Sequence, residues 1–134
     1  MTFVRATDVR WENLEWGDLG WVVHPAVAPE ATGLTVLDVV LQPGKGHDFH
    51  RHPSQQEVIY VASGTIEQWV EQERTILGPG DAAFIPTGAV HATFVAQDAA
   101  EPAHLVVSLG PSSGATGYDT LDMSGEAPWS TVRT

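Results

Sequence analysis

Residues 44–64 read GKGHDFHRHPSQQEVIYVASG, and this stretch holds three of the six histidines of the chain between two glycines. His50 and His52 are two residues apart, so on a β-strand both side chains would leave the same face and converge on one point. Such a pair is weak evidence alone, but Glu57 follows five residues beyond His52. The spacing therefore predicts that His50, His52 and Glu57 form one metal-binding cluster rather than a chance grouping.

Glu57 opens the apolar run EVIYVA, and Ile59 and Val61 share its parity along the chain. An alternating strand directs these three side chains to the same, buried face. A buried carboxylate needs a cation or several hydrogen-bond donors, because desolvating an unpaired charge is costly. We therefore expect Glu57 to face the histidines and to share a divalent cation with them.

The other histidines and nearby charged residues show no comparable pattern. His47, Asp48 and Arg51 lie in the same stretch, and we expect them on a loop or an outer face, exposed to solvent. His24 and His104 are isolated in the sequence, and an isolated histidine is more often a structural or surface residue than a ligand. None of these five residues is predicted to bind metal.

The composition limits the classes of function. A chain of 134 residues fits one domain. Its 17 acidic and 6 basic residues give a formal charge of -11, which opposes binding to nucleic acids or anionic membranes. The absence of cysteine leaves only nitrogen and oxygen ligands for a metal. Without a signal-peptide pattern or a long apolar run, we expect a soluble, cytoplasmic protein.

Short apolar runs broken by glycine, proline or aspartate predict an all-β domain without helical periodicity. The runs lie at residues 33–44, 57–70, 81–88, 91–98 and 104–111. In the first run, Leu37, Val39 and Leu41 share one parity, which predicts a strand buried on one face. The segments EVIYVA and TIEQWVE flank Ser63 and Gly64, a tight turn that predicts a β-hairpin.

The two ends of the chain differ from this central part. Residues 10–25 hold three tryptophans and two glycines, which predict a small hairpin against the main sheet, with the tryptophans in core or subunit contacts. After Gly110, small and turn-forming residues predict a tail that wraps the surface. We expect one domain over residues 1–134, divided into N-terminal strands (1–33), a core barrel (34–110) and a C-terminal tail (111–134).

This chain resembles the cupin superfamily, whose first motif is G-x5-H-x-H-x4-E-x6-G. Every position of that motif is filled, by Gly44, His50, His52, Glu57 and Gly64. The second cupin motif, G-x5-P-x-G-x2-H-x3-N, is matched by Gly80, Pro86, Gly88 and His91, with Val95 in place of the asparagine. Within the superfamily, the chain resembles small, single-domain, quercetinase-like metal-binding cupins.

The resemblance implies a jelly-roll β-barrel, also called a double-stranded β-helix, with a metal near its centre. It adds His91 to His50, His52 and Glu57 as metal ligands. The expected cofactor is one divalent first-row transition metal, which could be Fe, Mn, Ni, Cu, Co or Zn, because imidazole and carboxylate accept all of them. Val95 replaces a residue that is not usually a ligand, so it concerns local hydrogen bonding rather than the metal.

Cupins with this ligand pattern include dioxygenases, so the resemblance implies a metal-dependent dioxygenase or other oxidoreductase. Its substrate would be a small enolic or phenolic molecule that chelates the metal, with Glu57 as the catalytic base. One alternative is a metal-dependent isomerase, lyase or decarboxylase acting on a sugar or keto acid, and another is a non-catalytic small-molecule binder. The resemblance to small cupins also implies a homodimer.

The sequence leaves open which residues line the cavity, because strand register depends on pairing. Either member of each of three neighbouring pairs would fit: Gln68 or Trp69, Thr93 or Phe94, and Phe84 or Ile85. The N-terminal tryptophans are further candidates for the lining.

Overall fold

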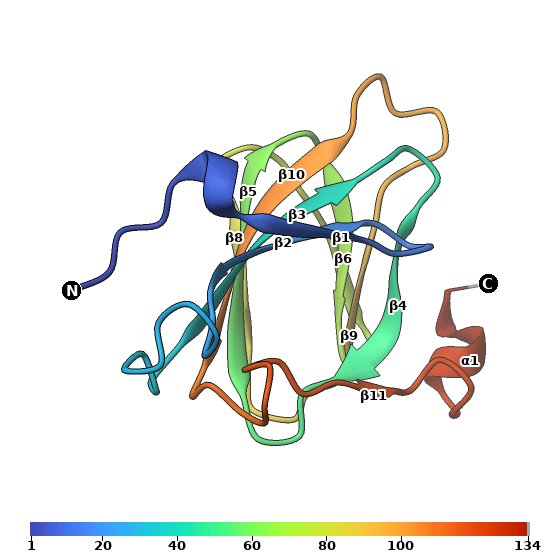
Figure 1. The fold of residues 1–134 in the computed structure, drawn as a ribbon. Coiled ribbons are helices and arrows are strands. Elements are labelled where there is room, and N and C mark those ends of the chain that lie inside the picture. The colour runs from blue at the N-terminus through green and yellow to red at the C-terminus, as the bar shows by residue number, and fades with distance from the viewer. Residues whose placement is uncertain (134) are drawn as a thin grey trace.

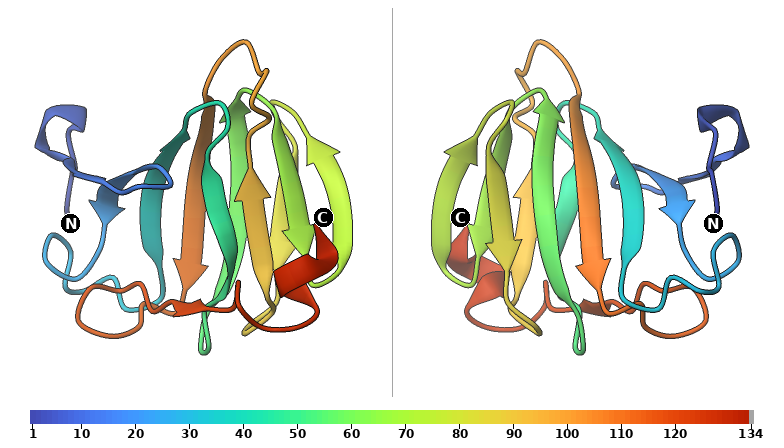
Figure 2. Two further views of the ribbon diagram at one scale, coloured as in Figure 1. Left: turned by 90° about the vertical axis from the view of Figure 1, so that its right-hand side faces the viewer. Right: turned by 90° about the vertical axis from the view of Figure 1, so that its left-hand side faces the viewer.

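Residues 1–133, which the computed structural model describes, form two antiparallel β-sheets that face each other (Figures 1 and 2). The six-stranded sheet contains, in spatial order, β1 (Arg10–Asn13), β2 (Asp18–Val23), β3 (Thr35–Leu41), β10 (Ala103–Gly110), β5 (Gln56–Ser63) and β8 (Ala82–Ile85). The five-stranded sheet contains β11 (Leu121–Asp122), β4 (Gly46–Arg51), β9 (His91–Phe94), β6 (Ile66–Val70) and β7 (Glu73–Leu77). This arrangement confirms the predicted all-β jelly-roll barrel.

The strands that line the barrel alternate in burial as predicted. In β3, Leu37, Val39 and Leu41 are buried, and the residues between them are half-buried. In β5, Ile59 and Val61 are buried between exposed neighbours. Burial of these apolar side chains between the two sheets drives the sheets together and makes most of the barrel interior apolar.

The predicted N-terminal hairpin is present. β1 pairs with β2, which in turn pairs with β3 at the edge of the six-stranded sheet. A short 3-10 helix, η1 (Ala6–Asp8), precedes it. Trp21 is buried, Trp11 is 43% exposed, and Trp16 is half-buried in the turn between the two strands. The three tryptophans therefore have different environments, although they are evenly spaced in the sequence.

The predicted hairpin between residues 57–62 and 65–71 is wrong. β5 pairs with β10 and β8 in one sheet, whereas β6 pairs with β7 and β9 in the other. Gly64 has a φ of +78°, and a Cβ atom there would lie 2.5 Å from the carbonyl oxygen of Pro102. The turn thus packs against the loop before β10 and crosses between the sheets. A glycine marks a turn without deciding which sheet the next strand joins.

The C-terminal tail packs on the outer face of the five-stranded sheet (Figure 2). An apolar cluster there consists of Phe49, Trp69, Val90 and Ala92, and α1 (Trp129–Val132) covers it. Arg133 lies over the ring of Phe94 at 3.7 Å and pairs with Glu67 at 2.9 Å. Within residues 1–133, η1 and α1 are the only helices; both are too short for a helical period to appear in the sequence, and neither could cross a membrane.

Candidate metal centre

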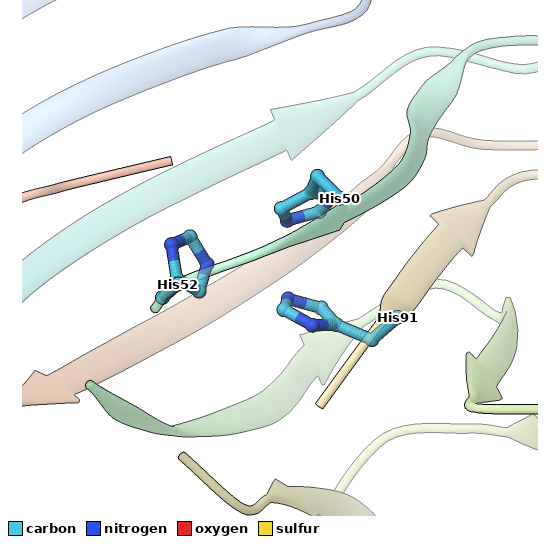
Figure 3. Close-up of side chains that lie close together, drawn as sticks. All are labelled: His50, His52 and His91. Carbon is cyan, nitrogen blue, oxygen red and sulfur yellow. The ribbon is translucent and has the colours of Figure 1, made fainter. Parts of the chain in front are cut away.

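The four predicted ligands come from three strands and meet inside the barrel. His50 lies in β4 with His52 directly after that strand, His91 begins β9, and Glu57 lies in β5. His50 and His91 are cross-strand partners, which places their side chains on the same face. All four side chains are buried, and one nitrogen from each histidine lies within 4.8 Å of the others (Figure 3). The three histidines form a group suitable for a metal ion.

Each of these imidazoles donates a hydrogen bond from Nδ1 to a main-chain carbonyl, which can only accept. The pairs are His50 with Asp48 at 2.7 Å, His52 with Asp119 at 2.9 Å, and His91 with Ala89 at 3.0 Å. These bonds fix the ring orientations and place a proton on Nδ1, which leaves the other ring nitrogen as the metal-binding atom.

The opposite ring nitrogens face a carboxylate. Nε2 of His52 lies 2.8 Å from Oε2 of Glu57, and Nε2 of His91 lies 3.3 Å from Oε1. Neither contact has the alignment of a hydrogen bond, and both nitrogens are buried without a hydrogen-bond partner in residues 1–133. With Nδ1 protonated, Nε2 of a neutral ring would present a lone pair toward a carboxylate oxygen. Such an arrangement requires a positive charge where these atoms converge, which either a proton on one ring or a metal ion supplies.

The electrostatics of the site agree with this geometry. Burial, with the neighbouring His47, holds the pKa of His50 well below its ordinary value, so this ring is neutral. Burial raises the pKa of Glu57, but the imidazoles of His91 and His52 more than offset this and hold it well below its usual range. Burial lowers the pKa of His91, but the Glu57 carboxylate outweighs burial and raises it. A metal would therefore displace a proton from His91.

Three of the four residues, His50, Glu57 and His91, line a cavity in the barrel whose walls are mainly apolar. The apolar lining residues include Leu19, Leu37, Val39, Ile59, Leu105 and Val107. Besides these three residues, the polar or aromatic lining residues are Trp16, His47, Thr93 and Tyr118. Among the described residues 1–133, no lysine or arginine lines this cavity.

Residues 37–109, more than half of the chain, match the sequence family described as the cupin domain. This chain belongs to the cupin family. The match contains both motifs and all four predicted ligands. No curated protein matches the chain.

Solved structures agree with this assignment. The structure of KdgF from Halomonas sp. has a TM-score of 0.71 at 21% identity, with 83% of this cupin and 94% of that chain covered. Oxalate decarboxylase from Bacillus subtilis has a TM-score of 0.76 at 20% identity, covering 92% of this cupin but only 32% of that chain. DMSP lyase DddQ from Ruegeria pomeroyi is 28% identical, with a TM-score of 0.59 and coverage of 72% and 46%. These neighbours support the cupin fold.

The structure decides the three choices that the sequence left open. The inward residues are Gln68, Thr93 and Ile85, whereas Trp69 and Phe94 belong to the outer cluster and Phe84 is 58% exposed. Of the inward residues, Thr93 lines the cavity, and its hydroxyl donates a hydrogen bond to Oε1 of Gln68 at 2.6 Å. Trp16 is the N-terminal tryptophan that reaches the cavity.

The prediction that His47 lies on a loop or outer face is wrong, because His47 lines the cavity of this cupin. Between the pairs His47 with Thr93 and His50 with His91, β4 has two residues where β9 has one. This β-bulge turns His47 to the same face as His50. Burial lowers the pKa of His47 to about 3, so its ring is neutral at neutral pH. An extra residue in one strand leaves no mark in a single sequence. Asp48 is exposed, as predicted.

The C-terminal tail supplies parts of the site that the sequence analysis missed. Tyr118 lines the cavity, with its ring centroid 5.0 Å from that of His52, and burial raises its pKa above the usual value. Asp119 provides the carbonyl that orients His52. The buried Gln55 accepts the N–H of Asp119 at 3.1 Å and donates to two tail carbonyls at 2.7 and 2.9 Å. Gln55 occupies a variable position of the first cupin motif, so the motif contains no signal for this role.

The remaining residues of interest lie outside the cavity lining. His24 is buried edge-on against Trp21, with ring centroids 5.5 Å apart, and His104 pairs with Asp38 on the six-stranded sheet. Val95, where the cupin motif has asparagine, is buried in the main core. The substitution therefore fills the core with an apolar side chain and leaves the metal centre untouched.

Proposed function

We propose that this cupin is a metal-dependent dioxygenase that acts on a small enolic or phenolic substrate able to chelate the metal. The observation that carries this proposal is the convergence of three imidazoles and one carboxylate beside an apolar cavity. A first-row transition metal, when bound, would hold the deprotonated substrate oxygen and activate dioxygen.

The residues that would hold the metal are His50, His52, His91 and Glu57. The Nδ1 bonds to main-chain carbonyls orient the three rings before any metal arrives, which supports ligand geometry and raises affinity. Because imidazole and carboxylate accept Fe, Mn, Ni, Cu, Co and Zn alike, metal supply would select among them.

The cavity lining supports an apolar chelating substrate. A sugar would need many hydrogen-bonding groups, and a keto acid would benefit from a cationic side chain for its carboxylate. The lining contains no lysine or arginine and has few polar groups apart from the proposed ligands. Apolar walls suit both an aromatic or enolic substrate and dioxygen, and they exclude water from the reacting atoms.

Glu57 would be the catalytic base. Within the part of the chain that the structure describes, it is the only carboxylate that lines the cavity. Its lowered pKa keeps it ionised at neutral pH. A substrate hydroxyl that enters the cavity would meet the Glu57 carboxylate beside the three histidines, and transfer of its proton to Glu57 would leave an enolate or phenolate.

A non-oxidative reaction, such as that of a metal-dependent lyase, is the second candidate. The 28% identity with DMSP lyase DddQ from Ruegeria pomeroyi favours it. The same four residues would hold the metal, which would then act as a Lewis acid without consuming oxygen.

Oxygen uptake distinguishes the two candidates. Protein reconstituted separately with each metal would be assayed against a panel of enols and catechols, with the Glu57→Gln variant as the inactive control. The proposal predicts substrate-dependent oxygen consumption by at least one metal form. Turnover of a substrate without oxygen consumption would replace it with the second candidate.

We also propose that the protein is a homodimer. Apolar side chains on the outer face of the six-stranded sheet are exposed at adjoining positions, with Val58 at 40%, Tyr60 at 45%, Phe84 at 58% and Val106 at 39%. Size-exclusion chromatography with light scattering tests this proposal, and a monomer at micromolar concentration would contradict it.

A further inference from the structure

His47 lines the cavity beside His50 and His91, and the metal proposal does not use it. The β-bulge in β4 turns its side chain inward. It is not part of the group whose ligand atoms lie within 4.8 Å of one another, which consists of His50, His52 and His91. Its position in the lining therefore needs a separate explanation.

Two aromatic rings fix the orientation of the His47 ring. The indole of Trp16 stacks on one face, with centroids 3.9 Å apart and planes 8° from parallel. The ring of His50 stacks on the other face, with centroids 3.5 Å apart and planes 13° from parallel. With both faces covered, the ring can interact with a further molecule only through its edge, which carries the two nitrogens.

These ring nitrogens are available for a ligand. The three proposed histidine ligands each use Nδ1 in a bond to a main-chain carbonyl. In residues 1–133, by contrast, no hydrogen bond or ion pair involves the ring of His47. Among the described residues, neither ring nitrogen of His47 is a buried atom without a partner, so solvent reaches the ring edge and an occupant of the cavity can hydrogen-bond it in place of water.

We propose that His47 is a substrate-contacting residue, whose ring edge hydrogen-bonds an oxygen atom of the chelating substrate while Trp16 and His50 hold the ring in place. This inference depends on the proposed function in one respect only, namely that the cavity accepts a chelating oxygen ligand beside the metal. It does not require that the ligand react with dioxygen.

The test uses 4-nitrocatechol, a planar chelating phenol whose visible absorption reports its binding, with zinc-reconstituted protein that has no redox chemistry. His47→Phe keeps an aromatic ring for stacking but removes both nitrogens. His47→Gln keeps hydrogen-bonding capacity but removes the ring. His104→Phe is the matched control, because His104 is outside the cavity lining. Elemental analysis and thermal unfolding would accompany each titration.

We expect wild-type affinity and full zinc content in His104→Phe. His47→Phe should retain zinc but raise the dissociation constant for nitrocatechol about tenfold or more, and His47→Gln should recover most of that loss. The inference would be overturned if His47→Phe bound nitrocatechol as tightly as the wild type, or if both His47 variants lost the same affinity. It would also be overturned if the wild type did not bind nitrocatechol. Tight binding by the wild type without oxygen consumption by any metal form would sink the dioxygenase proposal and leave the role of His47 intact.

Discussion

The Nδ1 atom of His52 donates a hydrogen bond to the main-chain carbonyl of Asp119, 67 residues later in the chain, at 2.9 Å. Asp119 is in turn held by Gln55, which accepts its N–H at 3.1 Å. A segment outside both cupin motifs thus orients one of the proposed metal ligands. Stability of the tail and affinity for the metal should therefore be linked.

Replacing Gln55 with leucine should weaken both properties. The change removes three hydrogen bonds and leaves tail groups unpaired, so the free energy of unfolding should fall by about 2–4 kcal/mol. Metal affinity should fall about tenfold, as is usual when the partner of a ligand is disturbed. Urea unfolding and a chelator competition would measure these effects. Gln56→Leu, at the exposed neighbouring position, should change neither; equal effects in both variants would contradict the account.

The sequence predicted the parts of this site that depend on local periodicity. His50 lies on β4, His52 directly follows that strand, and Glu57 lies on β5, so the alternation of side chains predicted which way they face, and His91 followed from the second cupin motif. His47 could not be predicted, since its direction depends on a bulge that is defined only by pairing with β9. Tyr118 and Asp119 reach the cavity through long-range contacts of the tail, and Gly64 marked a turn without specifying the sheet of β6.

The close packing of the turn at Gly64 can be tested by comparing alanine substitutions at Gly64 and at Gly80, a glycine of similar backbone conformation. Gly64 and Gly80 have φ values of +78° and +89°, so alanine is strained at either position. A Cβ at Gly64 would lie 2.5 Å from the oxygen of Pro102, whereas a Cβ at Gly80 would have no neighbour within 4 Å. Gly80→Ala should lower the free energy of unfolding by about 1 kcal/mol, and Gly64→Ala by about 3 kcal/mol or more. Similar losses in urea unfolding would show that the close packing at Gly64 is unimportant.

Restoring the asparagine of the second cupin motif should destabilise this protein. Val95 is 3% exposed in the main core, so Val95→Asn would bury an amide among apolar side chains at a cost of about 2–4 kcal/mol. Ile76→Asn, at a strand position that is 52% exposed, should cost less than about 1 kcal/mol. The prediction fails if the unfolding free energy of Val95→Asn equals or exceeds that of the wild type.

The metal-free protein should be most stable near pH 6.5. Burial lowers the pKa of His47 and His50 below the unfolded value of 6.5, so their contribution to stability is lost as the pH falls below that value. The Glu57 carboxylate raises the pKa of His91, so the stability from that pair is present below pH 6.5 and is lost as the pH rises through the raised pKa. Thermal unfolding from pH 5 to pH 9 would show this maximum.

The loss of stability above pH 6.5 should disappear when the interaction between His91 and the Glu57 carboxylate is removed. Glu57→Gln eliminates the charge that raises the pKa of His91, and a bound metal replaces the proton. The metal-free Glu57→Gln variant and the metal-loaded wild type should therefore each have a nearly constant melting temperature above pH 6.5. A decline that persists in Glu57→Gln would assign it to another group.

Elemental analysis of the untagged, purified protein tests the metal centre most directly. The account predicts close to one equivalent of a first-row transition metal in the wild type and in His104→Ala, and its loss in His50→Ala and His91→Ala. A wild-type protein that is purified without metal and also takes up none of the six candidate metals would contradict the account, and His50, His52, Glu57 and His91 would then form only a polar pocket.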